Sequence, residues 1–178
     1  MECALSTVIP SPLGEMLLCA TERGLCAAAF GTALPEAVRR HLARYKIAPP
    51  EPGRAAMLQT AEQQLAAYFA GQLQVFALPL DLRGTPFQRN VWYTLQRIAY
   101  GETWAYGEVA WSLGRPQAAQ AVGQAVGANP VAIIVPCHRV VGKDGTLTGY
   151  AGGLQRKAAL LQLENSVVQL PIPTVYEE

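Results

Sequence analysis

The first thirty residues alternate short apolar runs with turn-forming residues. One break falls at Ser11-Pro12-Leu13-Gly14, between two strand-like stretches, and another at Arg23-Gly24, before a third. Proline and glycine at such breaks end extended segments and reverse the chain. The pattern therefore predicts a small antiparallel sheet.

Two segments with a helical pattern follow the predicted sheet. The first spans residues 35–45, and the second, which is more strongly helical, spans residues 55–69 and ends at Gly71. The apolar residues at helical spacing in the second segment, which we expect to form a buried stripe, are Leu58, Leu65, Tyr68 and Phe69. A sheet with helices predicts an α/β domain.

The character of the chain changes at residues 79–86, a stretch that contains proline and glycine. Because such stretches often separate domains, we expect an N-terminal domain of residues 1–80 and a second domain of residues 81–178. The second domain opens with a predicted helix that closes at Gly101. The residues on its apolar face are Phe87, Val91, Leu95 and Ile98.

Two more helices are predicted on either side of a tight turn. They span residues 106–113 and 117–127, and the turn between them is Gly114-Arg115-Pro116. Helix-turn-helix modules have this arrangement, but ordinary helical hairpins have it as well, so the pattern leaves both open. In either case the second domain is predicted to be mainly α-helical.

The helix predicted over residues 117–127 is slim. Its small residues are Ala118, Ala119, Ala121, Val122, Gly123 and Ala125. A helix that reads the major groove of DNA normally presents Arg, Asn or Gln to the base edges. A slim helix that meets DNA suits the minor groove better, where little sequence is read. Close packing against neighbouring helices would explain the small residues equally.

The composition predicts a globular protein. Of the 178 residues 51% are hydrophobic, and no apolar run approaches the ~20 residues that cross a bilayer. Glu2 and Pro10 interrupt the opening segment, which therefore lacks the pattern of a secretory signal. We expect a soluble, cytoplasmic protein without a membrane partner.

The charge distribution adds little to this picture. Residues 80–165 hold eight basic and five acidic side chains, against six and eight in the rest of the chain, for a net charge of +1. This mild basic bias does not by itself identify a nucleic-acid-binding protein.

Four cysteines are present, at positions 3, 19, 26 and 137. Cytosolic thiols stay reduced, so we expect no disulfide framework. A zinc site would need about four N, S or O ligands, and His41 is the only histidine outside the segment around Cys137. We therefore expect no bound metal.

The segment from Ile133 to Gly142 has the clearest chemical potential. An apolar run with a proline leads directly into Cys137 and His138. A cysteine reacts as the thiolate and needs a base or a positive neighbour near neutral pH. Adjacent side chains on an extended chain diverge, so His138 would reach the sulfur only through a bend or a bridging water. A buried, inert Cys-His pair remains the alternative.

Pro136-Cys137-His138-Arg139-Val140 resembles the active-site signature of the O6-alkylguanine-DNA alkyltransferases. The other matching segments, in the family's order, are Thr85-Pro86-Phe87-Gln88, Val91-Trp92, Gly101-Glu102-Thr103 with Tyr106, Ala121-Val122-Gly123, Asn129-Pro130, Gly149-Tyr150, Gly152-Gly153-Leu154, and Lys157 through Leu161 to Glu164. The resemblance implies a ribonuclease H-like N-terminal domain, with an antiparallel sheet and helices, followed by a helical domain with a helix-turn-helix.

The resemblance also implies a mechanism. Cys137 would accept the alkyl group from O6 of guanine as a thioether, which nothing hydrolyses, so that each molecule acts once. His138 would take the thiol proton through a water, and Glu164 would orient its imidazole. Asn129 would tie the recognition helix to the active-site strand, and Tyr106 would donate to the departing purine. No cofactor is implied.

Further residues are implied to bind the substrate. The main-chain carbonyls of Cys137 and Val140 would read the exocyclic amine of guanine, and the Ala151 amide would face O6. The loop Tyr150-Ala151-Gly152 would form one wall of the pocket.

The implied partner is double-stranded DNA with O6-alkylguanine, bound by a monomer through the minor groove. The target nucleotide would swing out of the duplex, at a cost of a few kcal/mol. Gln120 stands where the family usually has an arginine that fills the vacated space, which predicts slower base extrusion. The other residues expected at the DNA are Arg115, Ala119, Ala121, Gly123 and Arg139.

Three other functions are compatible with parts of this pattern. A thiol hydrolase would use Cys137 and His138 but leaves the helix-turn-helix unexplained. Alkyltransferase-like proteins bind the lesion without repair and carry another residue at the position of Cys137. A DNA-binding regulator would need more base-reading side chains than the slim helix has.

After Glu164, Pro171 and Pro173 predict an extended tail.

Overall fold

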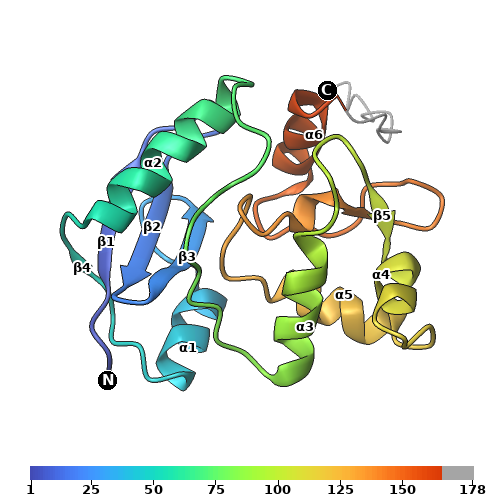
Figure 1. Cartoon of the computed structure of the whole chain (residues 1–178), viewed down its shortest axis with the longest axis horizontal. Helices are drawn as coiled ribbons and strands as arrows, with labels where there is room; N and C mark the ends of the chain where they lie inside the picture. Colours follow the sequence, from blue (N-terminus) through green and yellow to red (C-terminus); the bar gives the residue numbers. More distant parts are fainter. Residues whose placement is uncertain (166–178) are drawn as a thin grey trace, which may run out of the picture.

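A computed structural model describes residues 1–165 (Figure 1), so the predicted extended tail and the end of the predicted second domain lie outside the described residues. The N-terminal half contains β1 (Leu5–Ile9), β2 (Met16–Thr21), β3 (Gly24–Phe30), α1 (Glu36–Arg44), β4 (Glu51–Pro52) and α2 (Ala56–Phe69). The C-terminal half contains α3 (Pro86–Leu95), β5 (Trp104–Ala105), α4 (Tyr106–Ser112), α5 (Ala119–Gly127), the 3₁₀ helix η1 (Cys137–Arg139), β6 (Val140–Val141) and α6 (Leu154–Leu163).

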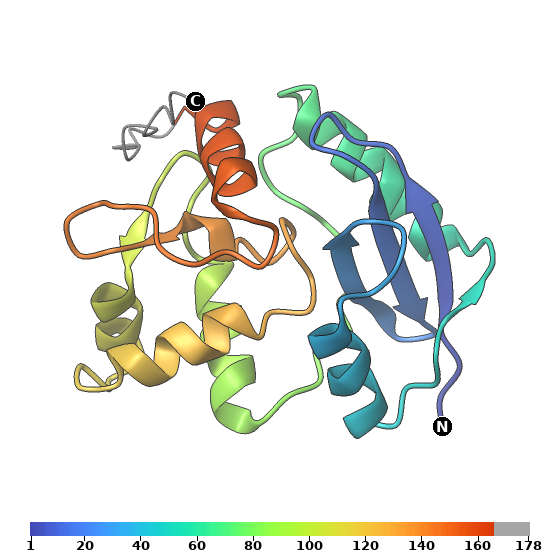
Figure 2. The same cartoon turned by 180° about the vertical axis from the view of Figure 1, so that it is seen from behind.

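The N-terminal half is a four-stranded sheet with a helix against each face (Figures 1 and 2). The strand order is β3-β2-β1-β4, in which β1 and β3 pair antiparallel with β2 and the two-residue β4 pairs parallel with β1. The predicted fold class, an α/β domain with an antiparallel sheet followed by a mainly helical domain, is confirmed.

Strand β2 is buried along its whole length because both faces of the sheet are covered. Met16 and Leu18 belong to the large core that includes residues of α2, whereas Leu17 and Cys19 pack with Leu42 of α1. This alternation follows from the two-residue period of a strand. Burial also raises the pKa of the Cys19 thiol to about 12, so this cysteine stays protonated and is a core residue.

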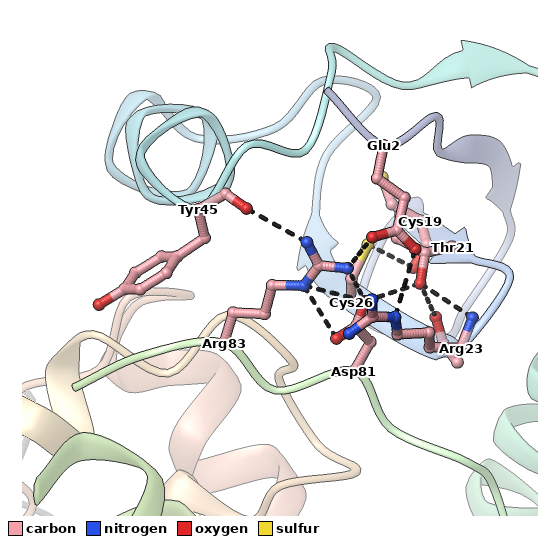
Figure 3. A network of polar contacts seen from close by, with 9 residues as sticks. Glu2, Cys19, Thr21, Arg23, Cys26, Tyr45, Asp81 and Arg83 are labelled. Carbon is pink, nitrogen blue, oxygen red and sulfur yellow. Dashed lines mark hydrogen bonds and ion pairs between the residues drawn. The ribbon is translucent and has the colours of Figure 1, made fainter. Parts of the chain in front are cut away.

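The segment between α2 and α3 is tied to the N-terminal half by a polar network (Figure 3). The Arg83 guanidinium donates to Asp81 Oδ2 at 2.7 Å, to the Glu2 carboxylate and to Tyr45 O at 3.2 Å, and Thr21 Oγ1 donates to Asp81 Oδ2 at 2.7 Å. Although burial opposes ionisation, the bonds from Arg83 and Thr21 hold the pKa of Asp81 below its usual range. The connection between the two halves is therefore held by charge-assisted hydrogen bonds.

The outer edge of β3 pairs with two segments from beyond the sheet. Leu25 bridges to Leu80 in the connecting segment, and Ala28 bridges to Val131, six residues before Cys137. Ala28 N donates to Pro130 O at 3.0 Å, and Ala132 N donates to Ala28 O at 2.9 Å. These bonds satisfy an edge that would otherwise be open, and they anchor the segment that leads to Cys137 on the N-terminal sheet.

The C-terminal half is built from short helices around Trp92. Helix α3 begins with a capping box, in which Thr85 and Gln88 exchange side-chain and backbone hydrogen bonds. Trp92 Nε1 donates to Ala125 O at 2.8 Å and so connects α3 to α5. Helices α4 and α5 pack against each other across a short turn, as the helix-turn-helix pattern predicts.

Within residues 1–165, no helix combines the length and apolar character that a membrane crossing requires.

Candidate active site

The backbone bends sharply twice just before Cys137. Ile134 N donates to Ala132 O at 2.9 Å around Ile133, and Cys137 N donates to Val135 O at 2.8 Å around Pro136. These two three-residue turns are γ-turns. They provide the bend that the proline before the cysteine predicts, and they lead Cys137 into the 3₁₀ helix η1.

The first of these turns is strained. Ile133 has a φ of +71°, which is unfavourable for a β-branched residue. Its side chain is buried, and the bonds from β3 hold the residues just before it. Such strain persists only where packing overdetermines it and is concentrated at functional sites. The N-terminal sheet thus helps to hold the backbone that presents Cys137.

Cys137 lines a cavity of ≈ 200 Å³ at the C-terminal end of α5. The other lining residues are Tyr106, Gly123, Val126, Gly127, Asn129, Ala132, Gly149, Tyr150, Ala151 and Gly152. The fold therefore brings together most of the residues that the sequence indicates for catalysis and substrate binding. Cys137 is 8% exposed, so little of its surface is accessible to solvent.

His138 does not line the cavity and is completely buried. Its Nε2 is 2.8 Å from Glu164 Oε1. Burial lowers the pKa of His138 despite the opposing effect of the carboxylate, so the imidazole is neutral near pH 7. With the proton on Nε2, Nδ1 carries the free lone pair, and it has no hydrogen-bond partner within residues 1–165. This nitrogen is available as a base.

Glu164 receives hydrogen bonds from three side chains, which together with it we call the Glu164 cluster. Besides His138, Tyr68 donates its hydroxyl to Oε1 at 2.7 Å, and Arg139 donates to both carboxylate oxygens at 2.9 Å. Burial opposes ionisation, but these bonds lower the pKa of Glu164 to about 2. Tyr68 comes from α2, so the N-terminal half contributes directly to the cluster.

The position of Arg139 differs from the DNA contact expected for it. The residue is 6% exposed, its guanidinium is engaged by Glu164, and its Nη1 donates to Ile98 O at 2.7 Å. A buried guanidinium that is bound by Glu164 and by Ile98 O does not reach phosphate or base. The expectation fails because Arg is mostly found at surfaces, and only a long-range carboxylate partner makes its burial possible.

Lys157 was missed as a site residue, although it lies in a segment that matches the family. It is completely buried on α6, and its Nζ donates to Val140 O at 2.6 Å and to Thr148 O at 2.7 Å. Burial lowers its pKa to about 8. The ammonium group therefore fixes the carbonyl of Val140, a predicted substrate-binding residue that is not among those lining the cavity.

The surroundings of the Cys137 thiol oppose its ionisation. Burial raises its pKa, and the Asn129 amide and the Lys157 charge oppose this effect only in part. Asn129 is itself held in place, since its Nδ2 donates to Val135 O at 2.9 Å and its Oδ1 accepts from Val131 N at 2.9 Å. The thiol therefore needs a proton acceptor before it can react.

The aromatic walls of the cavity come from α4 and from the loop before α6. The Tyr106 ring faces Gly123 of α5, where an added Cβ would approach it to 3.7 Å. Its hydroxyl is 3.3 Å from Thr148 Oγ1. The Tyr150 hydroxyl is buried and has no partner in the described part of the chain. Both side chains line the cavity.

The outer face of α5 lies beside the cavity. Gln120 and Ala121 are exposed, while Ala119 and Gly123 are half-buried. Arg115, in the turn before α5, is exposed, and its guanidinium lies 5.8 Å from the centre of the Phe87 ring. This face presents little side-chain bulk, as the sequence predicts for a shallow contact.

The fold and the site together define a class of protein in which a cysteine that lines a cavity lies beside a helix-turn-helix. Residues 86–166 match the DNA binding domain of 6-O-methylguanine DNA methyltransferase, and residues 5–82 match its ribonuclease-like domain. The chain belongs to the 6-O-methylguanine DNA methyltransferase family.

Proteins similar in sequence to this chain have names that match this family. A methylated-DNA–protein-cysteine methyltransferase of Methanosarcina acetivorans is 45% identical over 161 residues, which cover 89% of this chain and 97% of the relative. One from Mycobacterium bovis is 59% identical over 117 residues, 66% of this chain and 69% of the relative.

Solved structures of Mycobacterium tuberculosis proteins have the same fold. The structure of its O6-methylguanine methyltransferase has a TM-score of 0.78 and 47% identity, covering 90% of this chain and 92% of that one. The structure of OGT in complex with DNA has a TM-score of 0.77 and 46% identity, covering 91% and 92%.

Proposed function

We propose that this chain reverses alkylation damage in DNA by transferring an alkyl group from O6 of guanine to the sulfur of Cys137, once per molecule. One observation carries the proposal. Cys137 lines a cavity beside the slim helix α5, and the next residue, His138, has a buried neutral imidazole whose Nε2 is 2.8 Å from the Glu164 carboxylate. Nucleophile, base and orienting group are thus assembled where an everted base would arrive.

The chemistry follows from this assembly. His138 Nδ1 takes the thiol proton, through a bridging water, and the sulfur attacks the carbon bonded to O6. The C–O bond breaks as the C–S bond forms, and the guanine anion leaves and takes up a proton. The Tyr106 hydroxyl donates to the purine as the negative charge develops. The imidazolium formed on His138 is stabilised by Glu164, and the thioether on Cys137 is permanent.

The walls of the cavity suit a purine. The main-chain carbonyls of Cys137 and Val140 accept from the exocyclic amine, and the Ala151 amide faces O6. Val140 O already accepts from Lys157 Nζ, but a carbonyl oxygen has two lone pairs. Tyr150 and Gly152 complete the wall opposite α5. No step requires a cofactor.

Duplex DNA would bind along α5 through its minor groove. Ala119, Ala121 and Gly123 would allow close approach, Gln120 would enter the space left by the everted base, and Arg115 would contact phosphate. We assign residues 81–178 to DNA binding and transfer and residues 1–80 to support of the site. Because one chain holds all of these groups, we expect the protein to act as a monomer. We also expect it to act in the cytoplasm.

Intact-mass spectrometry after incubation with a duplex that contains O6-methylguanine tests this function. We expect a mass gain of one methyl group, located on Cys137 and absent from Cys137→Ala. A Cys137→Ala protein that still binds the lesion serves as the folded control. An unchanged mass of the wild-type protein would contradict the proposal. Tight lesion binding without that gain would indicate a lesion-binding protein, and ester cleavage with a regenerated thiol would indicate a hydrolase.

A further inference from the structure

Arg156 connects the substrate-facing loop to the N-terminal half of the molecule. It lies near the start of α6, and its half-buried guanidinium donates from Nη1 to Gly152 O at 3.1 Å and from Nε to Leu13 O at 2.9 Å. Gly152 lines the Cys137 cavity, and Leu13 lies in the turn between β1 and β2. One planar side chain thus joins two carbonyls from segments far apart in the sequence.

Phe30, at the end of β3, supports the same contact. Arg156 Cζ lies 4.6 Å from the centre of the Phe30 ring, within the range of a cation–π interaction. The ring also lies close to Gly152, because an added Cβ there would approach Phe30 Cδ2 to 2.9 Å and Tyr150 Cε1 to 2.7 Å. We call this pair the Arg156–Phe30 clasp. It holds the loop backbone against the N-terminal half.

A second cavity, of ≈ 190 Å³, lies behind the loop. Phe30 and Arg156 line it, together with residues of α1 such as Val38 and His41. The residues that line both this cavity and the Cys137 cavity are Gly127, Asn129, Ala132, Ala151 and Gly152. Ala151 and Gly152 of the loop therefore form part of a thin wall that separates the two cavities.

We propose that the Arg156–Phe30 clasp determines which O6 substituents the site accepts, because it prevents this wall from moving into the second cavity. The proposal rests on the function proposed above and names a residue that acts through the loop without touching the reacting atoms. With the clasp intact, the wall stays close to Cys137 and favours a small group such as methyl. Without it, the wall retreats, a bulky group such as benzyl gains room, and a methyl group is oriented less precisely.

The test compares two duplexes that carry O6-methylguanine or O6-benzylguanine at the same position. Rates of transfer to Cys137 are measured by intact mass for the wild type, Arg156→Ala, Arg156→Lys and Phe30→Leu. Arg97→Ala is the matched control, since Arg97 is exposed on the same half of the molecule. Thermal unfolding shows which variants fold, and Phe30→Leu tests the clasp independently if Arg156→Ala does not fold.

We expect the benzyl-to-methyl rate ratio of Arg156→Ala to rise at least about fivefold, with Arg97→Ala at the wild-type value. The benzyl-to-methyl rate ratio of Arg156→Lys should rise as that of Arg156→Ala does, because an ammonium group lacks the planar fork that reaches both carbonyls. An unchanged ratio, with both rates lowered equally, would overturn the proposal, and so would a ratio restored by lysine. Failure of the wild type to accept either group would overturn the proposed function instead.

Discussion

The Glu164 cluster and the outer face of α5 are constrained by the fold to very different degrees. In the cluster, Glu164 receives hydrogen bonds from Tyr68, His138 and Arg139, and all of these groups are buried. On α5, by contrast, Gln120 is exposed, and within the described residues no hydrogen bond or ion pair of its side chain is found. The base must be held in one tautomer and orientation, whereas a face that meets any sequence of DNA needs only to approach closely.

This difference predicts that changes in the cluster alter the stability and chemistry of the whole protein, whereas changes on α5 alter only the reaction with duplex DNA. Three experiments test this difference between the two regions.

The largest effect is expected from the ionisation of Glu164. Its pKa in the folded protein is about 2, below the usual value of 4.5, so the carboxylate stabilises the fold above pH 4.5, and this stabilisation is lost as the pH falls toward 2. The difference corresponds to roughly 3 kcal/mol. Urea unfolding of the wild type and Glu164→Gln at several pH values should show that the stability of the wild type falls more steeply with acid. Parallel curves would contradict this prediction.

A smaller effect is expected from the hydroxyl that α2 contributes. Tyr68→Phe removes the bond to Glu164 Oε1 and leaves a buried carboxylate with one donor fewer. We expect a loss of roughly 1–3 kcal/mol of unfolding free energy and slower transfer to Cys137, since His138 is held less firmly. Tyr93→Phe is the matched control, because Tyr93 is 54% exposed. Equal effects of the two substitutions would show that the bond to Glu164 does not matter.

The smallest effect is expected on α5. Gln120→Arg should increase the rate of repair of duplex DNA a few-fold, because the longer, charged side chain fills the space of the everted base better. This increase corresponds to a lowering of the activation free energy by about 1 kcal/mol. The rate with free O6-benzylguanine should not change. Gln124→Arg adds the same charge at another exposed position of α5 and controls for general attraction to phosphate. If both variants accelerate repair equally, position 120 has no special role.

The sequence predicted local features of the molecule well. The turns at Ser11-Pro12-Leu13-Gly14 and Arg23-Gly24 separate the strands as expected, and the helix predicted over residues 55–69 is α2, Ala56–Phe69. The helix predicted to reach Ile98 ends at Leu95, and the one predicted from residue 117 begins at Ala119. Such differences are confined to helix ends, where capping and packing decide the boundary.

The parts of the site that the sequence did not reveal depend on distant contacts. The parallel pairing of β5 with β6 joins Trp104 to Val140. Tyr68 was predicted as a core residue, which it is, but its bond to Glu164 connects positions 96 residues apart. Lys157 and Arg139 carry charges that favour the surface, and nothing near them in the sequence indicates the buried partners that hold them.

Hydrophobic periodicity and turn residues indicated the elements and their order, because each depends on neighbours within one or two turns of the chain, and the motif around Cys137 indicated the candidate nucleophile through its resemblance to the family. Only the tertiary structure decided which charges are buried, where the strained backbone at Ile133 is held, and how Arg156 reaches both Leu13 and Gly152. Those features require segments that the sequence separates to meet, and burial of a charge is stable only once its partner has arrived.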